Sequence, residues 1–127
     1  MLDIRIKTIP QAEQRYETAG DWQDRAIYIS DLGDTTKESL VALHELAEKI
    51  YCDTHSIPED GVTQFDIVYE ATRESGKAPC GCAHYVEPGD DPHSPYYKAH
   101  QIATIIERIM CLECGLDWIA YNTDIEE

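Results

Sequence analysis

The sequence predicts an α+β fold in which a short N-terminal antiparallel β-hairpin or small sheet is followed by three principal α-helices and a short C-terminal turn. Two observations lead to this prediction. Apolar and polar residues alternate near the start of the chain, as in a half-buried strand, whereas apolar residues recur at helical spacing in three later segments. Because the chain has 127 residues, we expect one domain, spanning 1–127, with a single hydrophobic core.

The strands are expected within residues 1–30. Ile4 and Ile6 alternate with basic residues before Pro10, and the run AIYIS at 26–30 is β-branched and aromatic. We expect these two strands to pair in antiparallel orientation, joined by the polar segment between them.

Helices are predicted at 34–53, 58–75 and 94–115. Asp34 or Thr35 can cap the first of these, and Gly115 is suited to end the third. The expected core faces consist of Leu40, Leu43, Leu46, Ala47 and Ile50 on the first helix, and of Ile102, Ile105, Ile106 and Ile109 on the third.

The charge balance restricts the partners that the chain can bind. Its 25 acidic and 10 basic residues give a formal net charge of -15, which repels nucleic acid and an anionic membrane surface and favours cations or basic proteins. No segment has the apolar length of a membrane span or the pattern of a signal peptide. We therefore expect a cytoplasmic protein that does not bind nucleic acid or membranes directly.

The segment HELAE, which begins at His44, carries the first candidate site. His44 and Glu48 lie one helical turn apart and can bind one cation, as the two histidines of an HExxH zinc site do. A carboxylate ligand makes such a site harder, so Mn, Fe or Mg would be accepted as well as Zn. Glu45 occupies the position of the general base in an HExxH helix.

The remaining ligands of this site must come from the other predicted helices. His100 is the first candidate, followed by Glu107, Asp66 and Glu70. His100 and Glu107 lie two turns apart on the side of the third helix opposite its isoleucines, whereas Asp66 and Glu70 lie beside the apolar face of the second helix. The alternative is that these side chains form an ordinary solvated helix surface, and for His100 by itself that alternative is stronger.

The cysteines suggest a second metal site of a different kind. Cys80 and Cys82 lie in the predicted loop 76–93, and Cys111 and Cys114 lie near the end of the third helix. In a reducing compartment, four thiols in two close pairs are typical of a structural zinc site. Alternatively, His84 replaces one thiol, or the helical cysteines only pack as small apolar groups.

Several short motifs, spread over most of the chain, resemble those of small phage and prophage proteins of uncharacterised function with an HELxE helix. These motifs are RIKTIP, QRY, GDW, VALHELAE, FDIVYE, EPGDDP, PY, H..AT.IER and GLDW. The resemblance implies a phage-related origin and a unit built around His44, Glu48, Asp66, His100 and Glu107. Two weaker resemblances are to the core of zincin-like metallopeptidases and to the acidic helix pairs of Mg-dependent, all-α nucleotide pyrophosphohydrolases.

Three functions are consistent with these observations. The first is metal-dependent hydrolysis at the HExxE helix, with Glu45 as the catalytic base. The second is non-catalytic: an acidic phage protein that binds and inhibits a basic host protein. The third is Mg-dependent hydrolysis of nucleotide pyrophosphates. A homodimer is also conceivable, through the aromatic residues Trp118 and Tyr121 of the C-terminal tail.

Overall fold

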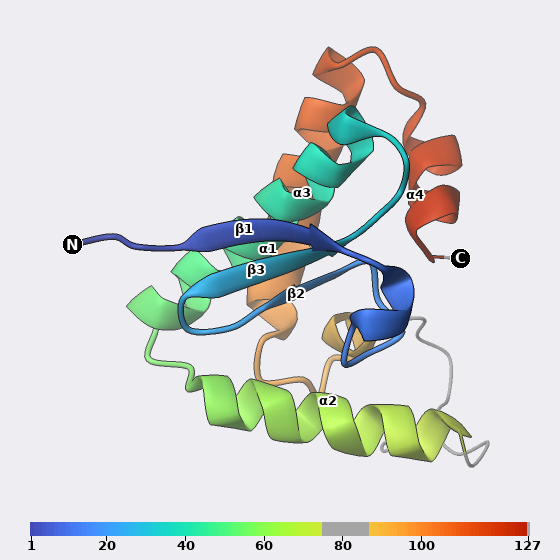
Figure 1. Ribbon diagram of the computed structural model, residues 1–127. Coiled ribbons are helices and arrows are strands. Elements are labelled where there is room, and N and C mark those ends of the chain that lie inside the picture. Colours follow the sequence, from blue (N-terminus) through green and yellow to red (C-terminus); the bar gives the residue numbers. More distant parts are fainter. Residues whose placement is uncertain (75–86, 127) are drawn as a thin grey trace.

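A three-stranded mixed sheet at the N-terminus is followed by four α-helices in the computed structural model (Figure 1). The structure describes residues 1–74 and 87–126. The architecture confirms the predicted α+β fold, a small N-terminal sheet followed by helices.

The sheet has the strand order β1-β3-β2. β1 (Arg5–Ile9) runs parallel to β3 (Ala26–Ser30), and β2 (Gly20–Trp22) runs antiparallel to β3. The prediction of two antiparallel strands was therefore wrong. β2 lies between β1 and β3 in the sequence and reverses the chain, but with three residues it is too short to show an alternating pattern.

α1 (Thr35–Thr54) is the central helix of the fold. It begins at Asp34, whose side chain accepts hydrogen bonds from two backbone amides of the first turn. The sheet packs on one side of α1 through Ile27 and Ile29, which are almost fully buried, and α3 packs on another side (Figure 1).

The buried face of α1 is rotated from the predicted one. Ile50 is 54% exposed, whereas Val41, His44 and Glu48 are buried. The polar side chains can lie inside because α3 and the sheet supply hydrogen-bond partners for them.

Three further α-helices complete the described chain: α2 (Glu59–Glu74), α3 (Tyr97–Glu113) and α4 (Trp118–Glu126). α4 stands where only a short turn was predicted, and Gly115 with its φ of 78° separates it from α3. A short 3-10 helix, η2 (Pro88–Asp90), precedes α3. None of the described helices has the length and apolarity needed to cross a bilayer.

The amphipathic orientation of α3 is opposite to the predicted one. Ile105 and Ile109 are 59% and 58% exposed, while His100 and Glu107 are buried against α1. The inner face also contains small residues, Ala99 and Ala103 among them, which allow α3 to approach α1 closely. The predicted core face of α3 is therefore a surface.

Gly20 allows β2 to approach α1. A Cβ atom at this position would lie 2.7 Å from Val41 Cγ1 and 2.8 Å from Glu45 Cγ, so no larger residue fits without displacement. We predict that Gly20→Ala lowers the free energy of unfolding by about 1–3 kcal/mol through overpacking.

Urea denaturation measures this change, and Gly61→Ala on α2 is the matched control. A Cβ at Gly61 would meet only the Pro58 ring, at 3.5 Å, so we expect unchanged stability or a gain of up to about 1 kcal/mol. Equal effects of the two substitutions would contradict the steric argument.

Candidate metal centre

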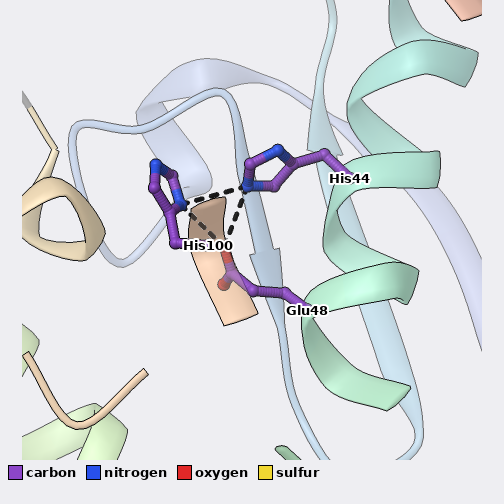
Figure 2. Close-up of side chains that lie close together, drawn as sticks. All are labelled: His44, Glu48 and His100. Atoms are coloured by element: carbon purple, nitrogen blue, oxygen red, sulfur yellow. Dashed lines mark hydrogen bonds and ion pairs between the residues drawn. The ribbon is translucent and has the colours of Figure 1, made fainter. Parts of the chain in front are cut away.

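Three potential ligand atoms converge between α1 and α3 (Figure 2). His44 Nε2 lies 2.8 Å from Glu48 Oε2, His100 Nδ1 lies 2.8 Å from the same oxygen, and the two nitrogens are 3.2 Å apart. All three residues are buried, with exposed fractions of 8%, 5% and 4%. The geometry therefore brings the predicted pair on one helix together with the first candidate for a third ligand.

The second ring nitrogen of His44 is held by Glu107. Nδ1 lies 2.8 Å from Glu107 Oε1, and the Tyr121 hydroxyl donates a hydrogen bond to Glu107 Oε2. Glu107, proposed from the sequence as a ligand, thus lies behind His44 and not among the converging ligand atoms. In this position it orients the imidazole so that Nε2 points towards Glu48 and His100.

The second ring nitrogen of His100 is held in the same manner by acidic residues just before α3. Nε2 lies 3.2 Å from Glu87 Oε2 and 3.0 Å from Asp90 Oδ1, and we call the segment 87–91 (EPGDD) the acidic turn. Gly89 makes this approach possible, because a Cβ there would lie 2.6 Å from His100 Cγ. These two carboxylates and His100 Nε2 form a second converging group among the described residues.

Glu48 also has a partner for its other oxygen. The indole N–H of Trp22, on β2, donates a hydrogen bond of 3.0 Å to Glu48 Oε1. Each of the three converging residues is therefore held from behind by a hydrogen-bonding group of a different element, an arrangement that fixes the orientation of metal ligands in proteins.

The pKa values of the three residues reflect their mutual contacts. Burial alone would lower the pKa of His44, but its hydrogen bonds to Glu107 and Glu48 raise that pKa well above the usual value. The pKa of His100 is likewise raised, because bonds to Asp90 and Glu48 outweigh its burial. Burial would raise the pKa of Glu48, yet its bonds with His100 and His44 lower it to about 2. The cluster therefore holds a carboxylate anion that attracts positive charge.

Glu45, the predicted base, lies beside the cluster and against β2. Burial and the charge of Glu48 raise its pKa well above the usual range. Two pockets, with cavity volumes of about 40 Å³ and 210 Å³, meet here and share Gly20, His44, Glu45, Glu87 and His100 as lining residues. The smaller pocket extends towards α2 and the larger towards α4, so the cluster can be reached from two directions.

Two acidic residues of α2 that were ligand candidates lie farther away. Asp66 lines the smaller pocket, where the Tyr96 hydroxyl donates a hydrogen bond of 2.8 Å to its Oδ1. Burial raises the pKa of Asp66 to about 7, although the bond from Tyr96 acts in the opposite direction. Glu70 is partly buried. Neither residue belongs to a converging group of ligand atoms in the part of the chain that the structure describes.

Only part of the proposed structural zinc site is visible. Cys111 is fully buried, and its thiol faces the carbonyl of Leu116 at 3.9 Å, whereas Cys114 is exposed at the end of α3. Cys80, Cys82 and His84 lie outside the described residues. The structural zinc site stays a prediction.

Four residues that hold the cluster in place were not identified from the sequence as part of the site: Trp22, Glu87, Asp90 and Tyr121. A signal was present for the acidic turn, since EPGDD stands a short distance before His100 and contains the glycine that the close approach requires. No sequence signal distinguishes Trp22 or Tyr121 from other core aromatics. Tyr121, expected to be exposed at a dimer contact, is 1% exposed.

Comparison with protein-family models, with curated proteins and with solved structures finds no significant match to this chain. The functional argument therefore relies on the geometry of the site.

The raised pKa of Asp66 gives a prediction about stability. Between about pH 4 and pH 7 the carboxyl ionises in the unfolded chain but stays protonated in the folded one, so folding is progressively disfavoured as the pH rises. We predict that Asp66→Asn removes this penalty, at most about 4 kcal/mol at pH 8, and changes little at pH 4.

Urea unfolding of both proteins at several pH values, in chelator, provides the measurement. The difference in the free energy of unfolding between the variant and the wild type reports the contribution of the Asp66 carboxyl group. A difference that does not vary with pH would contradict the prediction.

Proposed function

We propose that the protein is a metal-dependent hydrolase whose divalent cation is bound by His44 Nε2, Glu48 Oε2 and His100 Nδ1. The observation that carries the proposal is the convergence of these three atoms at 2.8–3.2 Å, inside the fold, with the far side of every ligand already held. Two histidines and one glutamate are the protein ligands of several zinc hydrolases.

A single assignment of protons satisfies every contact when a cation is bound. His44 donates its Nδ1–H to Glu107, His100 donates its Nε2–H to the acidic turn, and Trp22 donates to Glu48 Oε1. The inner nitrogens then both present lone pairs to the same point. Without a cation, the raised pKa values of His44 and His100 correspond to protonated rings whose inner N–H groups both donate to Glu48 Oε2.

The separations between the ligand atoms are compatible with more than one ion. With bonds of about 2.1 Å, neighbouring ligand atoms lie about 3.4 Å apart in a tetrahedral site and about 3.0 Å apart in an octahedral one. The observed range of 2.8–3.2 Å favours Mn²⁺ or Fe²⁺ as much as Zn²⁺. Zn²⁺ remains the first ion to test, because hydrolysis requires no redox chemistry.

Glu45 supports hydrolysis as the reaction. A bound divalent cation lowers the pKa of a coordinated water into the neutral range. Glu45 lies in the pocket that contains the ligands, and its carboxylate makes no hydrogen bond to another described residue. Because its pKa is raised, Glu45 would act as a base only when the charge of a bound cation keeps it ionised, and it would then take a proton from that water and pass it to a leaving group.

The charge of the site limits the substrate class. Acidic side chains line both pockets, and Arg15, the basic residue in the wall of the smaller one, is paired with Asp21 at 2.6 Å. Such walls repel phosphates. They favour a neutral or cationic substrate, which counts against hydrolysis of nucleotide pyrophosphates.

The non-catalytic alternative requires acidic residues on the outer surface. Asp91 is fully buried, and Glu87 and Asp90, whose side chains are 27% and 37% exposed, contact His100, so these three acids are engaged within the fold. This placement favours the metal centre over an acidic surface that binds a basic host protein.

Metal content is the first test of the proposal. We expect close to one equivalent of divalent metal at this site in protein purified without chelator, and loss of that metal in His44→Ala and His100→Ala. Glu107→Gln should retain the site with a metal affinity about 10–100-fold lower, because Glu107 only orients His44. Mass spectrometry of the metals and calorimetric titration of the apoprotein measure these quantities.

Two controls make the result specific. His55→Ala changes an exposed histidine at the end of α1 and should leave the metal content unchanged. Cys80→Ser with Cys82→Ser removes any zinc held by these thiols and substitutes no residue of the described helices. Wild-type protein that binds no metal, or unchanged metal content in His44→Ala, would refute the proposal.

The role of Glu45 can be separated from metal binding. Glu45→Gln should retain the metal, because Glu45 is not a ligand, but should lower hydrolytic turnover by about 10²–10⁴-fold. Turnover is measured on a panel of neutral and cationic ester and amide substrates with the metal-loaded protein. Activity equal to that of the wild type would exclude Glu45 as the base.

A further inference from the structure

The outer face of α3 is a stripe of apolar residues that points away from α1. Ile105, Ile106 and Ile109 are 59%, 38% and 58% exposed, although the sequence pattern alone predicts them to lie in the core. Among the described elements, α3 packs mainly on α1, η2 and α4, and its buried residues, Ala99, His100, Ala103, Glu107 and Cys111, are centred on the opposite side of the helix. A row of exposed isoleucines is unusual on a monomer surface.

The charges on this face are unlike those of the rest of the chain. From Tyr97 to Leu112 the only acidic residue is Glu107, which is buried, whereas the whole chain has 25 acidic residues. The exposed charges of the stripe are one lysine and one glutamate, at its two ends. We call the following set the α3 stripe: Lys98, Ile102, Ile105, Ile106, Ile109 and Glu113.

We propose that the α3 stripe is the contact surface of a two-fold homodimer in which α3 packs antiparallel to α3 of a second copy. Lys98, Ile102, Ile105, Ile109 and Glu113 follow one another at steps of three or four residues, so they lie along one side of the helix.

The stripe is complementary to itself in the antiparallel orientation. A two-fold axis between Ile105 and Ile106 brings Ile102 opposite Ile109 of the second copy. The same axis brings Lys98 opposite Glu113 of the second copy, because each lies about 11 Å from the axis along the helix. One operation therefore aligns the apolar residues and pairs both charged ends, as an isologous interface requires. In a parallel orientation, Lys98 would face Lys98 of the second copy and Glu113 would face Glu113, so like charges would repel.

A second copy is the occupant that the charges favour. Two chains of charge -15 repel each other through most of their surfaces, but the α3 stripe presents no such repulsion. The dimer does not depend on the metal centre, because the stripe lies on the opposite face of α3 from His100. Since a single helix pair is smaller than a standard interface of about 800 Å² per partner, we expect a dissociation constant in the micromolar range.

Sedimentation velocity over low micromolar to several hundred micromolar concentrations tests the proposal. The full chain should change from monomer to dimer over this range. Ile109→Glu should weaken association by at least about tenfold, because the two-fold axis places the new charge in the interface twice. Ile119→Glu is the matched control, since Ile119 is 75% exposed but lies on α4, outside the stripe, and association should be unchanged.

A charge exchange tests the antiparallel register. Lys98→Glu alone and Glu113→Lys alone should each weaken the dimer several-fold, and the double variant should restore the wild-type affinity. Far-UV circular dichroism shows that each variant is folded, which is expected because every substituted side chain is at the surface. A wild type that stays monomeric throughout, equal effects of Ile109→Glu and Ile119→Glu, or a double variant weaker than both single variants would overturn the proposal.

Discussion

The packing of α3 against α1 through buried polar side chains is the contact on which the rest of the structure depends. Buried carboxylates and imidazoles are costly unless they are paired, and here His44, Glu48, His100 and Glu107 each meet a partner from the facing helix or from the adjoining elements. Ala99 and Ala103 bring the helix backbones close enough for these contacts. The same interactions therefore determine the position of α3 and the geometry of the candidate site.

This contact brings together site residues from elements that are distant in the sequence. α1 supplies His44 and Glu48, α3 supplies His100, and the sheet contributes the indole of Trp22 (Figures 1 and 2). The acidic turn closes the site behind His100. In this protein, which has a large excess of acidic residues, several carboxylates lie around a point where a divalent cation would offset part of their charge.

The reversed orientation of α3 connects the site with the surface. Because His100 and Glu107 occupy the inner face, the isoleucines at the usual core spacing are left outside. Their exposure carries a free-energy cost, which burial between two copies would reduce. The proposed dimer would thus offset part of the cost of a polar centre in a small domain, without contributing a residue to that centre.

Much of the local structure was predictable. Alternation identified β1, a β-branched and aromatic run identified β3, helical periodicity located α1, α2 and α3, and Asp34, one of two predicted caps, marks the start of α1. The spacing of His44 and Glu48, together with the choice of His100, also indicated the three residues that converge. These features are local, because capping, periodicity and a one-turn separation are properties of a single segment.

The sequence by itself determined the α+β fold, the helices and a pair of potential ligands on one turn of α1. Tertiary structure alone decided which face of each helix lies inside, that β1 and β3 are parallel, and that Glu107 supports His44 from behind. The physical reason is that periodicity ranks faces by hydrophobicity, whereas a polar face is buried when the neighbouring element satisfies its hydrogen bonds. That condition involves residues far apart in the chain, so it becomes visible only once α1, α3 and the acidic turn are in place.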